Sequence, residues 1–125
     1  MNFNRIILFQ APKKIIIMFG NGITESLFFL VISLVYYFFN PKEINSFFGY
    51  RTYQSKKNLK NWTLANTLAS MIFLVGSVCC LTLSIFLNLF SSIDSIYGFH
   101  TMLSLTIIFC ISIVEYKLHF ANSEN

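Results

Sequence analysis

The sequence predicts an all-α membrane protein, with three transmembrane helices and a short ordered basic loop between the first two. Two observations carry this prediction. Hydrophobic residues make up 55% of the 125 residues and charged residues 11%, against about 25% charged residues in an average soluble domain. A soluble domain of this length would leave much of that apolar side-chain surface in water. The apolar residues are also gathered into three long runs.

Each apolar run is long enough to cross a bilayer, which takes about 20 residues with a range of ~17–25. The runs cover residues 22–39, about 64–90 and about 96–114. The first can extend back to residue 15. It ends at Asn40, because the residue before Pro41 is disfavoured in helical geometry.

The two ends of the chain are expected to lie outside the three-helix domain, which covers residues 20–120. Glycines at positions 20 and 22 weaken a helix there, so residues 1–19 are predicted to form a separate interfacial segment with Lys13 and Lys14 near lipid phosphates. Whether this segment crosses, lies on or leaves the membrane stays open. Residues 121–125 are predicted to be a frayed polar tail.

The second helix is predicted to begin before the membrane, with Ser55 as its N-cap. One face of this helix carries small and polar residues at helical spacing, which allows close helix–helix contact in lipid. The members of this face are Asn58, Trp62, Ala65, Asn66, Ala69, Phe73, Gly76 and Cys80.

Basic residues gather between the first two runs and predict the topology. Residues 40–61 hold Glu43 as their single acid, whereas Asp94 is the charged residue between the second and third runs. By the positive-inside rule the first loop and the C-terminus are cytoplasmic and the N-terminus is outside. The basic residues of the loop are Lys42, Arg51, Lys56, Lys57 and Lys60, and those that argue against this orientation are Arg5, Lys13 and Lys14.

The loop carries a recognisable motif. It reads Pro41-Lys42-Glu43-Ile44-Asn45-Ser46-Phe47-Phe48-Gly49-Tyr50-Arg51-Thr52 and continues through Ser55, Lys57-Asn58, Trp62 and Ala65-Asn66. This segment resembles the SdpI family, named for an immunity protein against a secreted sporulation-delaying toxin of bacilli. The family has a tyrosine where this chain has Phe48. The resemblance covers residues 22–120 and is most specific over 41–66.

The resemblance implies a multi-pass protein of the bacterial cytoplasmic (inner) membrane that gives immunity to an antimicrobial peptide or protein toxin. In some members this role is coupled to sequestering a cytoplasmic transcriptional repressor at the membrane. The expected partners are therefore membrane lipids and a secreted peptide toxin or a repressor, and an oligomer is also open. The alternative function is a small accessory subunit of a larger membrane complex, which would pack through the small-residue face and the aromatic first helix.

The motif residues allow two compatible interpretations. In one, the segment from Gly49 to Asn66 is architectural and fixes the angle between the first two helices. In the other, it forms a surface that binds a partner or lipid. Arg51 offers a planar fork of donors that suits a helix-end carbonyl, a lipid phosphate or a carboxylate.

Glu25 and His100 are predicted to lie at similar depth near the outer leaflet, where they could form an intramembrane polar pair. Ionisable residues within a membrane usually face the protein interior and often mark function. The alternative is that both reach water at the outer interface.

Neither catalysis nor a cofactor is predicted. The acidic and histidine residues form no paired-carboxylate site, zinc-binding motif or catalytic triad with recognisable spacing. No cluster of histidine and cysteine suggests a metal. Because the basic residues flank apolar runs, anionic lipid head groups are expected as their neighbours instead of nucleic acid. Cys79 and Cys80 are expected at a different membrane depth from Cys110, too far for a disulfide.

Overall fold

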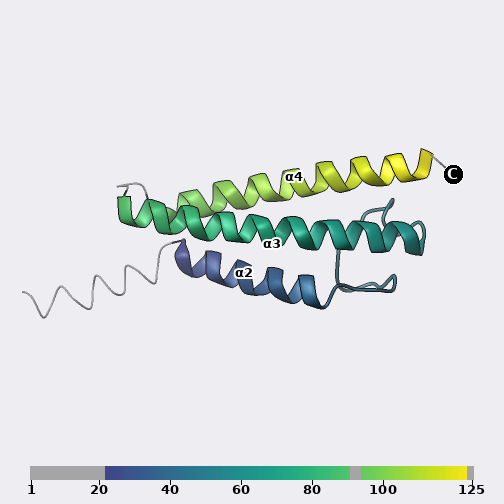
Figure 1. Cartoon of the computed structure of the whole chain (residues 1–125), viewed down its shortest axis with the longest axis horizontal. Helices are drawn as coiled ribbons and strands as arrows, with labels where there is room; N and C mark the ends of the chain where they lie inside the picture. Colours follow the sequence, from purple (N-terminus) through teal and green to yellow (C-terminus); the bar gives the residue numbers. More distant parts are fainter. Residues whose placement is uncertain (1–21, 91–93, 124–125) are drawn as a thin grey trace, which may run out of the picture.

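The computed structural model describes residues 22–90 and 94–123, and this part of the chain is helical with no strand. Its elements are α2 (Ile23–Phe38), α3 (Leu59–Phe90) and α4 (Ser95–Ser123). Consecutive helices run in opposite directions along one long axis (Figure 1). The predicted all-α fold is confirmed, and the predicted interfacial segment 1–19 lies outside the described residues.

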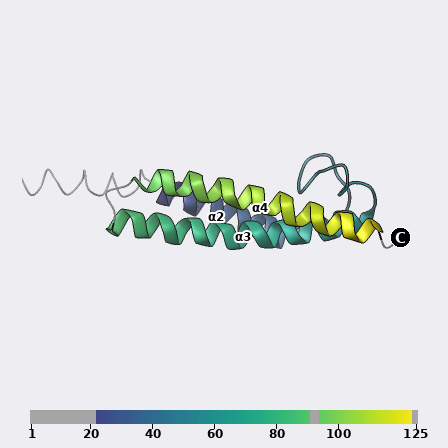
Figure 2. The ribbon, with the colours of Figure 1, turned by 90° about the horizontal axis from the view of Figure 1, so that it is seen from above.

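The helix α3 is the central element of the bundle. It packs extensively against both α2 and α4, which contact each other far less. The loop between α2 and α3 lies at the end of the bundle where the C-terminus lies, in both views (Figures 1 and 2). We call this the loop end of the bundle, and the end where α2 begins the opposite end.

Two of the three helices are long and apolar enough to cross a membrane. They are α3, with 32 residues, and α4, with 29. The helix α2 has 16 residues and a length of about 24 Å at 1.5 Å per residue, which is short of the ~30 Å hydrocarbon core. Its observed bounds lie within one residue of the predicted run at each end.

The start of α3 differs from the prediction. Ser55 does not cap it, because its hydroxyl donates to the carbonyls of Tyr50 (3.1 Å) and Thr52 (2.9 Å). Asn58 is the cap, and its Oδ1 accepts from the backbone N–H of Asn61 at 2.8 Å. Residues 53–58 form turns and bends instead of a helix.

The helix α4 begins and ends outside the run predicted to cross the membrane. Asp94 precedes it, and its Oδ1 accepts from the N–H of Ile96 at 3.1 Å, an arrangement typical of a helix N-cap. At the other end the helix continues to Ser123. The predicted frayed tail is therefore helical over residues 121–123.

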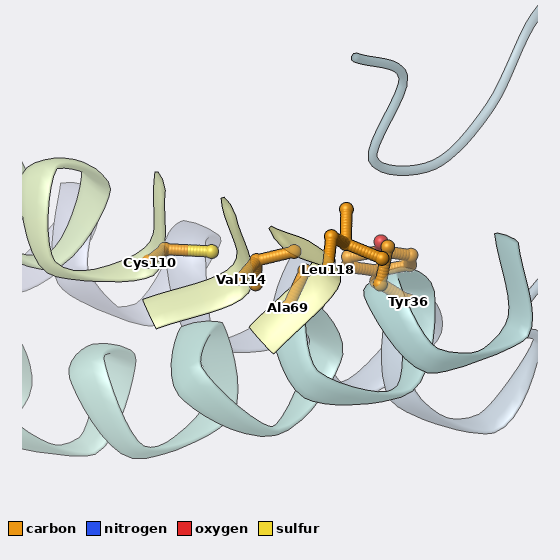
Figure 3. Close-up of a cluster of buried hydrophobic side chains, with 6 residues drawn as sticks. Tyr36, Ala69, Cys110, Val114 and Leu118 are labelled. Carbon is orange, nitrogen blue, oxygen red and sulfur yellow. The ribbon is translucent and has the colours of Figure 1, made fainter. Parts of the chain in front are cut away.

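The buried core lies where α3 meets its two neighbours. Ala65 and Ala69 of α3 are fully buried with Val114 and Leu118 of α4, and Tyr36 of α2 completes the cluster (Figure 3). The small-residue face predicted on α3 is thus the face that packs inside the chain. Its contact with α4 is close enough that a Cβ added at Gly76 would lie 2.6 Å from the hydroxyl oxygen of Thr106.

At the opposite end of the bundle, the described residues include a close backbone approach and a contact between two serine hydroxyls. Gly22 adopts φ 51°, and a Cβ there would overlap the Ser95 carbonyl and lie 2.8 Å from the Ile96 nitrogen. One turn further on, the Ser26 and Ser84 hydroxyls are 2.8 Å apart. These contacts bring the start of α2 beside both other helices.

Candidate functional site

The side chain of Asn66 is the centre of a hydrogen-bond network at the loop end. Its Oδ1 accepts from the Tyr36 hydroxyl (2.8 Å) and from the backbone N–H of Tyr50 (2.7 Å). Its Nδ2 donates to the carbonyl of Trp62 at 2.9 Å. One buried amide therefore joins α2, the loop and α3.

Trp62 fastens the loop to α3 at a second point. Its indole is fully buried, and its Nε1–H donates to the Pro41 carbonyl at 2.9 Å. Next to it, Asn40 donates to the Thr67 hydroxyl at 3.3 Å. The end of α2 is therefore tied to α3 two turns after the start of α3. We call Tyr36, Pro41, Tyr50, Trp62 and Asn66 the loop network.

Gly49 allows the loop to pass close to Asn66. Its φ is 107°, a value that side chains with a Cβ rarely adopt. A Cβ at this position would also overlap Asn66 Oδ1 and approach the Pro41 ring to 2.8 Å. The motif glycine is therefore required by both the backbone angle and the space.

Tyr50 connects the loop to α4. Its hydroxyl donates to Glu115 Oε1 at 3.0 Å. Burial, followed by the hydrogen bond to Glu115, raises the pKa of the Tyr50 phenol. The phenol therefore stays protonated and able to donate well above neutral pH. With this contact, the loop touches all three helices.

Three further motif residues shape the loop itself. Asn45 Oδ1 accepts from the N–H groups of Phe47 (3.0 Å) and Phe48 (2.8 Å), as in a turn stabilised by an asparagine side chain. The Thr52 hydroxyl accepts from the N–H of Ser55 at 3.3 Å. These contacts are local, and they fix the path between Pro41 and α3.

Arg51 differs from the motif residues described so far. Its side chain is exposed, and among residues 22–90 and 94–123 no hydrogen bond or ion pair involves its guanidinium. The backbone of the neighbouring Tyr50 is held at two points. Its N–H donates to Asn66 Oδ1, and its carbonyl accepts from the Ser55 hydroxyl. The backbone of Arg51 is thus fixed while its charged group is free to bind.

A groove of about 520 Å³ lies beside the loop network, between α2 and α4. Its sides include Ile32 and Ile107, Phe73 of α3 contributes its base, and residues 48–51 of the loop bound one end. Ligand sites in proteins typically have ~300–1,000 Å³ and mostly apolar walls. We call this space the α2–α4 groove.

Comparison with known proteins identifies the family. A family model described as the SdpI/YfhL protein family matches residues 42–115. This range takes in most of the loop, all of α3 and most of α4, which is more than half of the chain. The chain belongs to the SdpI/YfhL family. The resemblance predicted from the motif is therefore confirmed. No curated protein and no solved structure matches the chain.

The motif that identifies this SdpI/YfhL member is thus mostly structural in its contacts. Six of its residues hold the loop or its start through hydrogen bonds or close approach, and Thr52 assists them. They are Pro41, Asn45, Gly49, Tyr50, Ser55 and Asn66. Trp62 and Asn58 hold the loop and begin α3. These contacts favour the architectural interpretation for the motif residues that make them, whereas Arg51, like Lys42 and Lys57, is exposed and makes none of them with its side chain.

The predicted pair of Glu25 and His100 is not joined in the structure. Glu25 is half-buried, and its Oε2 is buried with no hydrogen-bond partner among the described residues. His100 is exposed on α4, with its ring centre 5.2 Å from that of Phe99. A functional role for this pair stays a prediction.

Several contributors to the site could not be found by the motif alone. Tyr36 of α2 belongs to the loop network, and Glu115 of α4 accepts a hydrogen bond from its member Tyr50. A second tie joins Asn61 to the Gln54 carbonyl (3.0 Å) and to Asn122 Oδ1 (3.1 Å) near the C-terminus. In the sequence, these residues stand out as polar side chains near the ends of apolar runs. That pattern does not show which residue each side chain contacts.

Proposed function

We propose that this SdpI/YfhL member is an integral membrane immunity protein that protects its host cell from an antimicrobial peptide or protein toxin. It would act by binding the toxin or by shielding the toxin's target in the membrane. The observation that carries the proposal is the family match over residues 42–115. That range contains most of the loop, all of α3 and most of α4.

The proposal includes a three-span topology. The short helix α2 crosses together with α3 and α4, since Gly22 contacts the start of α4 and Asn40 contacts Thr67 of α3. The first two turns of α3 then extend beyond the end of α2 on the loop side. Because the loop is basic, this side is cytoplasmic in the bacterial inner membrane, with the C-terminus beside it.

The surface chemistry supports a membrane role. Large apolar side chains such as Phe28, Val31 and Ile108 are exposed on α2 and α4, at 68%, 57% and 62%. Such surfaces are suited to acyl chains. Protection by binding the toxin or shielding its target would then take place at the membrane.

The accessory-subunit alternative loses one of its two expected docking surfaces. It relied on the small-residue face of α3, and Ala65, Ala69 and Gly76 of that face are buried inside the chain itself. The exposed aromatic face of α2 is equally suited to lipid. The immunity role does not rely on either of these docking surfaces.

A killing assay in the native bacterium tests the proposal. We expect a strain lacking this protein to become sensitive to the peptide fraction of its own culture medium, and the wild-type copy to restore growth. Purification of the tagged protein from native membranes into nanodiscs, followed by mass spectrometry, provides the second measurement. Recovery alone or with one small secreted peptide supports immunity. A stoichiometric set of larger membrane proteins, with no change in sensitivity, would establish the accessory role instead.

A further inference from the structure

The α2–α4 groove has a mostly apolar lining that includes one buried hydroxyl without a hydrogen-bond partner among the described residues. Ser33 of α2 lines the groove, is 1% exposed, and its hydroxyl has no hydrogen-bond partner among the described residues. Serines in helices usually bond a carbonyl of the preceding turn, as Ser26 does with the Gly22 carbonyl at 2.6 Å. A buried hydroxyl left without a partner is unfavourable. An acceptor group bound in the groove would satisfy it.

The loop end of the same groove carries the free guanidinium of Arg51. Arg51 is among the lining residues, and its planar donors match the oxygens of a phosphate group in a two-point contact. The loop around it is basic, with Glu43 as its single acid between residues 40 and 61. The mouth of the groove is therefore complementary to an anion.

The remaining wall determines what kind of anion fits. The groove follows α4 from Leu103 to Ile111, which is about 12 Å at 1.5 Å per residue. A peptide laid along it would bring an N–H and a C=O with every residue, each of which needs a partner. Ile32, Phe73 and Ile107 offer none. An acyl chain has no such groups, so the wall suits a lipid tail.

We propose that the α2–α4 groove binds one anionic phospholipid. Its phosphate lies on the Arg51 guanidinium, an ester carbonyl accepts from the Ser33 hydroxyl, and one acyl chain lies against Ile32, Phe73 and Ile107. The loop network serves this site by holding residues 49–51 over the end of the groove. The site goes beyond the proposed immunity role and does not depend on which toxin is involved.

Binding of defined lipids to the full-length protein tests the site. Protein purified in detergent and stripped of lipid is titrated with phosphatidylglycerol or with phosphatidylcholine of the same chains, and bound lipid is counted by native mass spectrometry. The variants are Arg51→Gln, Ser33→Ala and, as the matched control, Lys57→Gln, which removes a basic loop residue that does not line the groove.

The expected result is one phosphatidylglycerol held by the wild type and by Lys57→Gln. Affinity for it falls about tenfold in Arg51→Gln, because a two-point charged contact is lost, and about threefold in Ser33→Ala. Ser33→Ala should also unfold no earlier than the wild type without lipid, since it removes an unpartnered hydroxyl. Equal affinity in all four proteins, or equal binding of both lipids, would overturn the proposal. So would a peptide or a second copy of the chain found in place of lipid.

Discussion

The two ends of the bundle are held together by different means. At the loop end, Asn66 joins α2, the loop and α3 through three hydrogen bonds, and Tyr50 reaches Glu115 on α4. At the opposite end, Gly22 passes close to Ser95, the Ser26 and Ser84 hydroxyls are 2.8 Å apart, and the Leu87 side chain lies against Gly98. Among the described residues, a buried amide joins three elements at the first end, whereas close approach at two glycines marks the second.

This difference shows what the family motif does. Its residues lie at the loop end and are mostly engaged in holding the loop, so their presence need not mean that each contacts a ligand. Arg51 is held in place by engaged neighbours while its own guanidinium has no partner among the described residues. Binding is therefore to be sought at Arg51 and in the groove beside it.

The largest effect is expected from Asn66→Ala. The substitution leaves the Tyr50 N–H and the Tyr36 hydroxyl without their shared acceptor and should lower the free energy of unfolding by about 2–3 kcal/mol. Titration of the detergent-solubilised protein with dodecyl sulfate, followed by circular dichroism, measures it. Thr82→Ala is the control, since Thr82 is exposed and bonds its own helix, and it should stay within ~0.5 kcal/mol. Equal loss in both variants would mean that the network adds nothing specific.

The next effect is expected from Trp62→Phe. Phenylalanine keeps most of the buried ring but removes the Nε1–H that donates to Pro41, at an expected cost of about 1–2 kcal/mol. Limited proteolysis of the loop under native conditions reports the same contact, because residues 42–57 should be cut faster in the variant. An unchanged cutting rate would show that the indole serves for packing alone.

A smaller effect is expected from Tyr50→Phe. It removes the hydrogen bond to Glu115 at a half-buried site and should cost about 1 kcal/mol. Glu115→Gln is the matched variant, since its amide oxygen can still accept from the phenol and so should cost less. The same unfolding titration ranks the two. A larger loss in Glu115→Gln would indicate that the carboxylate has a partner other than Tyr50.

The smallest effect is expected at the opposite end. Ser26→Ala and Ser84→Ala each remove one hydroxyl of a pair, and interhelical hydrogen bonds in membrane proteins average about 0.6 kcal/mol in double-mutant cycles. The double variant should therefore lose little more than either single one. A coupling as large as the effect of Asn66→Ala would erase the proposed contrast between the two ends.

The helices were predictable because their signals are local or periodic. The break at Asn40-Pro41 and the small residues of α3 gave the end of α2 and the buried face of α3 from the sequence. The N-cap of α3 was predicted wrongly as Ser55, since serine and asparagine are similarly good caps. Turns and bends at residues 53–58 separate Ser55 from the helix, and the hydrogen bond from the Asn61 N–H identifies Asn58 as the cap.

The contacts within the site were not predictable in the same way. The two donors to Asn66 come from positions 30 and 16 residues away, and neither helical spacing nor a turn signal links such positions. Tyr36, near the end of an apolar run, has the pattern of a residue at the membrane interface, although it is buried in the core. Nothing in the sequence marks Ser33. What distinguishes it is a buried hydroxyl without a hydrogen-bond partner among the described residues, and this is visible only in the structure.

The contrast between the motif residues that hold the loop and Arg51 is tested most directly by one comparison. The free energy of unfolding is measured without lipid for the wild type, Asn66→Ala and Arg51→Gln. We predict a clear loss for Asn66→Ala and a value within ~0.5 kcal/mol of the wild type for Arg51→Gln, as for most exposed substitutions. A loss in Arg51→Gln as large as that in Asn66→Ala would contradict the account, because Arg51 would then belong to the structure that holds the loop.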